Sequence, residues 1–306
     1  MKVGKVLDVL LHKKGKLMLM LMPYYQRFLS DRTYIKMYYL FSMGKRLDLN
    51  NPKTFNEKLN WLKLYDRNPL YTTLVDKYAV KHWVTERIGK QYVIPTYGVW
   101  NSFDEIDFDI LPVKFVLKTT HGGGSVGVVI CKDKSTFDKA SARSKLESSM
   151  KISGYDTVRE WPYKNVPRRI IAEKYINSEV STNGLPDYKF FCFDGVVKAL
   201  FVATDRAIGD VKFDFFDANF KHLDLYQRHP MSGKVISKPD SFEEMKYIAS
   251  RLSKGLPSAR VDLYYVNGKV YFGEITFFHH AGVVPFHPEK WDEIFGSWIT
   301  LPEKRK

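Results

Sequence analysis

The chain has 306 residues, of which 44% are hydrophobic and 27% are charged, so it is typical of a soluble globular protein with one large domain or two moderate ones. Two cysteines, Cys131 and Cys192, are too few for a disulfide framework, which indicates a reducing compartment, and we expect a cytoplasmic protein. The formal net charge of +14 favours an anionic partner. We expect no nucleic-acid partner, because the sequence has no zinc-finger spacing, basic-zipper heptad or RNA-binding signature.

The first 50 residues carry half of this net charge, with ten Lys or Arg against three Asp. Apolar runs near the N-terminus are interrupted by Asp8 and by lysines at 13, 14 and 16, and the longest run, 17–22, is too short to span a bilayer. Two interpretations stay open. The segment is either a helix packed on its own domain or a basic arm on an anionic membrane, at the inner face of the plasma membrane.

Four helices are predicted along the chain. Thr54 and Glu57 have the spacing of a capping box, and Phe55, Leu59, Leu62 and Tyr65 behind them fall on one helical face. A second helix is expected over 73–88, with Gly89 as its stop signal. Further helices are predicted near 135–150 and 241–255.

Short strands alternate with these helices after Pro95. The predicted strands are 114–119, 126–131, 169–176, 188–193, 196–203, 211–216, 261–266 and 270–276. Tight turns such as Asp194-Gly195 and Asn267-Gly268 favour antiparallel neighbours, so the fold class is expected to be α+β.

A glycine-rich loop joins two β-branched runs in VLKTTHGGGSVGVVICKD, residues 116–133. Gly122 and Gly127 have the spacing of a P-loop, but Val128 and Val129 stand where Lys and Ser or Thr should follow, which excludes a Walker-type site. Either the loop is a plain hairpin turn, or its bare N–H groups close over phosphates beside Lys118.

Two further stretches place charged residues within apolar strands. RIIAEKYI, 169–176, carries Glu173, which is either a solvated strand-edge partner of a lysine or part of a hinge that reads an adenine edge. ARVDLYYVNGKVYFGEITF, 259–277, is predicted to be a hairpin with Asp262 on one arm and Glu274 on the other. Its carboxylates are hard oxygen ligands of the kind that Mg²⁺ requires, although a cross-strand salt bridge between Arg260 and Glu274 is the alternative.

The register of this hairpin decides whether its two carboxylates can share a metal ion. With a two-residue turn at Asn267-Gly268, Glu274 would lie opposite Val261, and Asp262 would face the other side of the sheet. A shared ion therefore predicts a three-residue loop with Gly268 in a left-handed bulge.

Taken in order, six blocks resemble the ATP-grasp superfamily, most closely its TupA-like branch, named for a teichuronopeptide biosynthesis protein. The blocks are NPKTFNEKLNWLKLYDR, LVDKYAVKHWV, FVLKTTHGGGSVGVV, IIAEKYI, DYKFFCFDGVVK and RVDLYYVNGKVYFGEITF, and the likeness covers roughly residues 50–298. The resemblance implies two α+β halves that clamp ATP and Mg²⁺. We expect these halves at 71–172 and 173–306, after a basic helical N-terminal region at 1–70.

The resemblance also implies roles for individual residues. The expected nucleotide contacts are Lys77, Lys118, the loop His121, Gly122, Gly123, Gly124 and Ser125, the hinge Glu173, Tyr175 and Ile176, and the ribose ligand Glu179. The expected metal ligands are Asp262, Glu274 and Thr276. Arg260, Lys118 and Lys189 are expected to act on the phosphates during transfer, and Arg206, His279 and His280 are candidates for substrate contact.

By this resemblance, the reaction is ATP-dependent carboxylate–amine ligation through an acyl phosphate. The TupA-like branch implies a cell-surface or capsule polysaccharide as the target, with an amine or amino acid joined to a uronic acid of an acidic glycan or lipid-linked saccharide. The alternatives are a glycosyltransferase, whose D-x-D motif neither Asp205-Arg206 nor the stretch from Asp214 to Asp217 fits, a kinase that stops at phosphorylation, and an ATP-binding protein without turnover.

Two features depart from the superfamily pattern. Thr276 stands where many members have a metal-binding Asn, and a hydroxyl is a poorer ligand. The chain before Lys77 also lacks the Rossmann-like domain that often precedes an ATP-grasp core. The acceptor pocket therefore cannot be transferred from better-known ligases.

Overall fold

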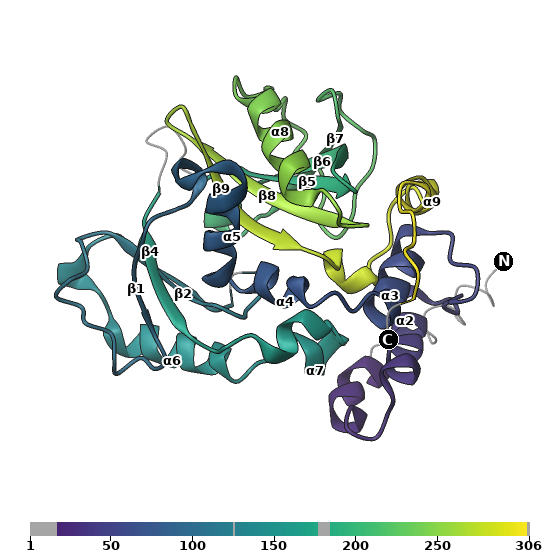
Figure 1. Ribbon diagram of the computed structural model, residues 1–306, viewed down its shortest axis with the longest axis horizontal. Coiled ribbons are helices and arrows are strands. Elements are labelled where there is room, and N and C mark those ends of the chain that lie inside the picture. Colours follow the sequence, from purple (N-terminus) through teal and green to yellow (C-terminus); the bar gives the residue numbers. More distant parts are fainter. Residues whose placement is uncertain (1–16, 125, 177–183, 305–306) are drawn as a thin grey trace.

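The computed structural model describes residues 17–124, 126–176 and 184–304. Within these residues, the strands form two antiparallel sheets, one of four strands in the order β1-β4-β2-β3 and one of five in the order β7-β6-β5-β8-β9. Figure 1 shows α4 and α5 between the four-stranded sheet and β9. The expected α+β class with antiparallel neighbours is confirmed.

The strands are β1 Thr96–Trp100, β2 Phe115–Thr119, β3 Val128–Cys131, β4 Ile170–Lys174, β5 Asp187–Phe193, β6 Val196–Thr204, β7 Lys212–Asp217, β8 Ala259–Val266 and β9 Lys269–Thr276. The α-helices are α2 Asp31–Met43, α3 Phe55–Tyr65, α4 Leu70–Val75, α5 Ala79–Ile88, α6 Lys139–Met150, α7 Gly154–Val158, α8 Phe242–Ser253 and α9 Lys290–Ser297, and residues 17–25 are also helical. Short 3₁₀ turns include η3 Trp161–Asn165, η4 Arg206–Ile208 and η5 His279–Gly282.

Helix α3 begins where the sequence predicts. The Thr54 hydroxyl accepts from the Glu57 N–H, and the Glu57 carboxylate accepts from the Thr54 N–H at 3.1 Å, so the capping box is formed. The face that carries Phe55, Leu59 and Leu62 is buried. The apolar face that the sequence spacing predicts is therefore the face of α3 that packs in the core.

The single helix predicted over 73–88 is wrong, because the chain breaks between α4 and α5. The Asp76 carboxylate accepts from the backbone N–H groups of Tyr78 and Ala79, at 2.8 and 3.2 Å, and so starts α5 afresh. The Lys77 N–H donates to the Thr120 carbonyl at 3.0 Å. A continuous helix would use these N–H groups internally, whereas here the break presents Lys77 to the glycine loop.

The hairpin formed by β8 and β9 reaches the expected pairing by a different route. Asn267 and Gly268 both have positive φ, 50° and 76°, and Val266 pairs with Lys269, so the turn has two residues and the predicted three-residue loop is wrong. A bulge at Gly273 then shifts the register, and Asp262 pairs with Glu274. A Cβ on Gly273 would lie 3.0 Å from the Asp262 carbonyl oxygen, which explains why glycine suits the bulge.

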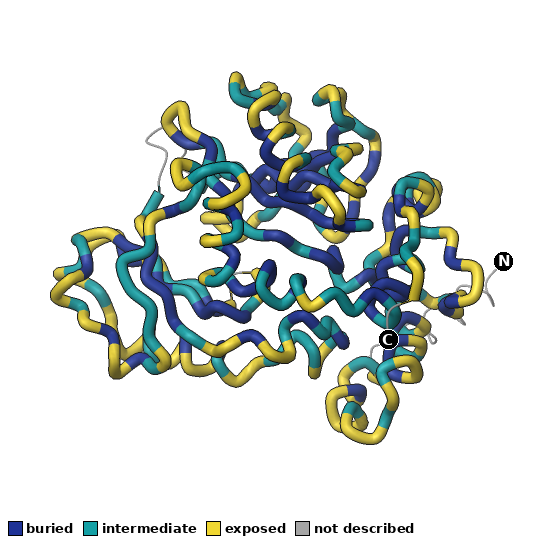
Figure 2. Tube along the Cα trace, in the orientation of Figure 1, coloured by how far each residue is buried: buried dark blue, intermediate teal, exposed yellow. Residues whose placement is uncertain are grey.

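In the part of the chain that the structure describes, buried apolar residues form two separate clusters, and Figure 2 shows their dark segments. The larger cluster joins the five-stranded sheet to α3, α4, α5, α8 and α9, and the smaller joins the four-stranded sheet to α6. The helices before the first sheet thus pack mainly with the second sheet. The predicted ranges 1–70, 71–172 and 173–306 stay predictions.

We expect Gly296→Ala to destabilise the fold by about 1–3 kcal/mol, because it overpacks the contact between α9 and the start of α3. A Cβ at Gly296 would lie 2.2 Å from the Lys53 carbonyl oxygen, and backbone cannot rotate away. Urea unfolding measures the change. Ser297→Ala, on the exposed side of the same helix, is the matched control and should change stability little. Equal stability of the two variants would contradict the close packing of α9 on α3.

Candidate active site

A small polar cleft lies where the two sheets face each other, and it is partly open to solvent. Both sheets and the helices between them contribute to its wall, which is formed by Lys77, Lys81, Val93, Ile94, Lys118, Glu173, Phe272 and Gly273. Three lysines and one glutamate in so small a volume make the wall cationic. Such a wall suits an anionic ligand.

Glu173 lies at the bottom of this cleft between two lysines. Its carboxylate is 2.5 Å from Lys118 Nζ and 2.6 Å from Lys81 Nζ, and it is buried. Burial alone raises the pKa of the Glu173 carboxyl, but the two ammonium groups outweigh burial and hold the pKa below its usual value. A side-chain contact from Glu173 to an adenine edge would have to displace a lysine, and the hinge role stays a prediction.

The glycine loop follows β2, as the sequence predicts. The Thr119 N–H donates to the Gly127 carbonyl at 3.0 Å and closes the loop. A Cβ on Gly127 would lie 2.2 Å from Thr119 Oγ1, whereas one on Gly123 would meet open space. Gly127 is thus required for packing, and Gly123 leaves its backbone accessible to a ligand.

The predicted nucleotide contacts around this loop have different outcomes. His121 is buried, with its ring Nε2 3.3 Å from the Ser149 carbonyl, and its contact with nucleotide stays a prediction. Burial lowers the pKa of His121. Tyr175 and Ile176 follow β4 and are half-buried. Ser125 and Glu179 lie outside the described residues.

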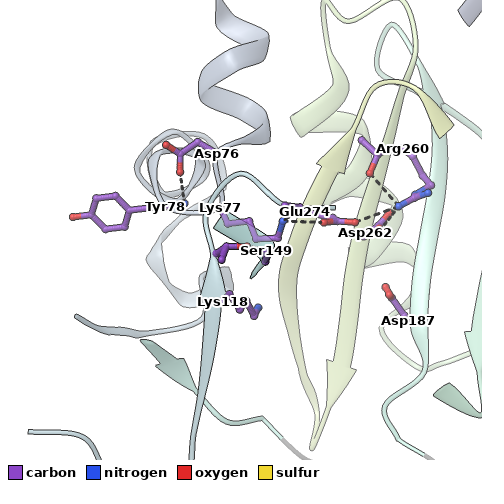
Figure 3. Close-up of polar contacts among 12 residues, drawn as sticks. Asp76, Lys77, Tyr78, Lys118, Ser149, Asp187, Arg260, Asp262 and Glu274 are labelled. Atoms are coloured by element: carbon purple, nitrogen blue, oxygen red, sulfur yellow. Dashed lines mark hydrogen bonds and ion pairs between the residues drawn. The ribbon is translucent and has the colours of Figure 1, made fainter. Parts of the chain in front are cut away.

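Lys77 connects the two halves of the site. Its ammonium donates to the Gly122 carbonyl on the loop and lies 3.9 Å from the Glu274 carboxylate on β9 (Figure 3). Burial lowers the pKa of Lys77. Lys77 and Lys118 line the same cleft, and their contact with one ligand stays a prediction.

Asp262 is the most tightly held carboxylate of the second half. Arg260 donates to both of its oxygens at 2.7 Å, and Lys189 donates to Oδ2. Burial opposes ionisation of Asp262, but Arg260 and Lys189 outweigh it and lower the pKa. Arg260 also contacts Thr276 Oγ1 at 3.0 Å and Glu274 Oε1 at 3.4 Å. The cross-strand salt bridge that the sequence left open is therefore present, together with the paired carboxylates.

The Asp187 carboxylate also belongs to the site, although the sequence patterns did not single it out. It lies 2.6 Å from Lys189 Nζ and 2.6 Å from Arg206 Nη1, and its Oδ1 is buried with no hydrogen-bond partner in the described part of the chain. Burial raises the pKa of Asp187. The signal was available, because Asp187 and Lys189 are two residues apart on one strand and so share a face.

The three predicted substrate contacts are differently placed. Both ring nitrogens of buried His279 are engaged by protein groups, Nδ1 by Arg260 at 2.8 Å and Nε2 by Gln227 at 2.7 Å. Both ring nitrogens therefore already have protein partners, and a substrate contact for His279 stays a prediction. His280 keeps a buried Nε2 without a partner among the described residues, and Arg206 has a half-exposed side chain, so both stay predictions.

The donors on β8 and β9 fit a magnesium ion in part. Among the residues that the structure describes, no three His, Cys, Asp or Glu side chains cluster so as to hold a metal by themselves. However, Asp262 and Glu274 are cross-strand partners, and Mg²⁺ commonly binds one or two carboxylates together with phosphate oxygens and water. Thr276 Oγ1 already accepts from Arg260, so it is the weakest of the three predicted ligands.

Comparison with known proteins identifies one family that this chain resembles. The model of the family described as TupA-like ATPgrasp matches residues 57–300. No curated protein matches the chain.

Three solved structures illustrate the likeness of fold. The D-alanine–D-alanine ligase of Helicobacter pylori has 15% identity and a TM-score of 0.47, with 83% of this chain and 68% of that chain covered. The corresponding ligase of Bacillus anthracis has 21% identity and a TM-score of 0.39, with 80% and 66% covered. N5-carboxyaminoimidazole synthetase of Staphylococcus aureus complexed with ADP has 14% identity and a TM-score of 0.38, with 90% of this chain and 60% of that chain covered. The chain therefore spans about two thirds of the length of these proteins.

We expect Glu173→Gln to lower the free energy of unfolding by about 3–5 kcal/mol, because it leaves Lys81 and Lys118 facing each other without a counter-charge. Urea unfolding without nucleotide measures the loss. Glu147→Gln on α6, in a half-exposed ion pair with Arg143, is the control and should cost less than 1 kcal/mol. A small effect at Glu173 would mean that the two lysines are not held by its charge.

Proposed function

Because the chain belongs to the TupA-like ATP-grasp family, a class of ATP-dependent ligases that form C–N bonds, we propose that it joins an amine or amino acid to the carboxyl group of a uronic acid. The acceptor class is an acidic glycan or lipid-linked saccharide of a cell-surface or capsule polysaccharide. ATP and Mg²⁺ are the proposed cofactors.

One observation carries this proposal. Lys77 and Lys118, beside the four-stranded sheet, face the hairpin that bears Arg260, Asp262 and Glu274, and the two sides meet where Lys77 lies 3.9 Å from Glu274. Cations from one side and carboxylates with a guanidinium from the other are what a triphosphate with its metal ion requires. Catalysis of phosphoryl transfer consists mainly of such positioning and charge neutralisation.

The proposed reaction has two steps. An oxygen of the acceptor carboxylate forms a bond to the γ-phosphorus, the bond from that phosphorus to the β–γ bridging oxygen breaks, and ADP leaves. The amine then attacks the acyl carbon, phosphate departs, and the amine loses a proton to solvent. Lys77 and Lys118 bind the β- and γ-phosphates, and Arg260 and Lys189 stabilise the charge on the transferred group. Magnesium held by Asp262 and Glu274 would neutralise phosphate charge.

Three features support an anionic acceptor. The net charge of +14 attracts polyanions. Arg206 presents a half-exposed guanidinium and shares Asp187 with Lys189 of β5. On η5, His280 has a ring nitrogen without a partner among the described residues. Together they offer donors to a carboxylate or to sugar hydroxyls.

Membership in a family of ligases favours ligation over the alternative reaction, glycosyl transfer. Product analysis separates ligation from a reaction that stops at phosphorylation. Mass spectrometry of reactions with ATP, Mg²⁺, a uronic-acid glycan and mixed amino acids should show an amide adduct and ADP. Phosphorylated glycan without an amide would indicate a kinase, and unchanged ATP would refute turnover.

We expect Asp262→Asn to reduce ADP release at least about 100-fold, because the phosphates lose charge compensation and the site loses its best-held carboxylate. Asp104→Asn, at a largely exposed carboxylate on the surface, is the control. Circular dichroism establishes that both variants are folded. Near-normal ADP release from folded Asp262→Asn would remove the metal assignment.

We further propose that the N-terminal segment binds anionic lipid, close to lipid-linked acceptors. Leu17, Met20, Tyr24 and Phe28 have largely exposed side chains, and Phe28 is 84% exposed. Exposed Arg27 adds positive charge among them. Over the described ranges, no helix has the length and apolar character needed to cross a bilayer.

Vesicle flotation tests this surface. The full chain should float with phosphatidylglycerol vesicles at low salt and less with phosphatidylcholine vesicles, because each basic residue near an anionic surface contributes about 1 kcal/mol. Replacing Tyr24 and Phe28 by Ser should abolish flotation, whereas Val235→Ser, at an exposed apolar residue elsewhere, should not. Protein that stays at the bottom with both lipids would exclude the lipid partner.

A further inference from the structure

Arg260 is held from two sides. On one side its Nε and Nη2 groups donate to Asp262 at 2.7 Å each, in a bidentate pair. On the other side its Nη1 lies 2.8 Å from His279 Nδ1. The proposed reaction uses Arg260 at the transferred phosphoryl group, so whatever fixes this guanidinium bears on catalysis.

The chemistry of the guanidinium fixes the proton positions in this chain of contacts. Arginine can only donate, so His279 Nδ1 must accept and the ring must be neutral. Its proton is then on Nε2 and is donated to Gln227 Oε1 at 2.7 Å. The Gln227 amide in turn donates to the Val284 carbonyl at 2.8 Å. Every group in this chain has one consistent donor or acceptor role.

The side chains of His279 and Gln227 are shielded from solvent. Gln227 is 0% exposed and His279 is 2% exposed, and the His279 ring packs edge-on against Phe191 with centroids 4.9 Å apart. Burial, followed by the neighbouring cationic groups, lowers the pKa of His279 well below its ordinary value. The neutral ring that the geometry demands is thus the form that its environment favours.

We propose that His279 and Gln227 are positioning residues that hold Arg260 in place for phosphoryl transfer while Asp262 is engaged with a metal ion. This inference rests on the proposed function. A carboxylate that shares its oxygens with a cation holds a guanidinium less firmly, whereas the neutral imidazole has no charge to share. The His279 contact therefore remains when the Asp262 contact weakens.

Two substitutions separate this role from packing. His279→Asn places an amide oxygen close to the position of Nδ1, so it retains the acceptor for Arg260 but leaves a void. His279→Phe fills the volume in an aromatic environment but removes the acceptor. Positioning predicts that kcat for ADP release falls by about 10–100-fold in His279→Phe, with little change in the KM for ATP, and falls much less in His279→Asn.

A purely structural role predicts the reverse order, with the volume-filling Phe variant more active and the Asn variant less active. Activity that follows melting temperature across the two variants would therefore overturn the proposal. His82→Asn and His82→Phe, at an exposed histidine on α5, are matched controls and should leave both quantities unchanged. Gln227→Met, which keeps volume but cannot accept from Nε2, should lower kcat in the same direction by a smaller factor.

A spectroscopic measurement tests the contact without turnover. In full-length protein with ¹⁵N-labelled histidine, the His279 ring should appear at pH 7 as the neutral tautomer protonated at Nε2, with Nδ1 as an acceptor. A ring protonated at Nδ1, or at both nitrogens, would overturn the proposal even in active enzyme. If wild-type protein gave no turnover, the proposed function would fail, and this spectrum would still decide the His279–Arg260 contact.

Discussion

The carboxylate of Asp262 is the constraint around which the second half of the site is arranged. It is almost completely buried, and a buried carboxylate is costly unless cations and donors compensate it. Arg260 and Lys189 provide that compensation from its own strand and from the neighbouring β5. Each of these cations in turn needs further acceptors, which brings Asp187, Glu274 and His279 into one network. The site is therefore a set of mutually dependent charges.

Much of the fold follows from local patterns in the sequence. The capping box at Thr54 and the apolar and aromatic run of β5 concern preferences within a few residues, where propensity and spacing decide. The break at Asp76 was missed, because an apolar helical period continues across it. What ends the helix is the backbone bond from Lys77 to Thr120, a long-range contact.

The candidate site divides in the same way. Of the residues that the sequence singled out, Lys77 and Lys118 line one cleft, and Glu274 lies 3.9 Å from Lys77. Asp262 pairs with Glu274 across the hairpin, and the roles of all four residues stay predictions. The register argument for the hairpin failed at Gly273, because a bulge within a strand leaves no mark except a glycine. No sequence pattern indicated a role for Gln227, because a single glutamine in a loop is not part of any motif. Its role follows only from its contact with His279, which is distant in the sequence.

The separation into two apolar clusters has a mechanical consequence for the segment at Asp76 and Lys77. That segment leads from α4 into α5, which pack with the larger cluster, yet it is fastened to the four-stranded side by the Lys77–Thr120 backbone bond and by Arg169, 2.7 Å from Asp76. Lys77 is therefore attached to both sides of the cleft: its backbone is bonded to the four-stranded side, and its ammonium lies 3.9 Å from Glu274 on the five-stranded sheet. A change at this one position would consequently be felt by both sheets.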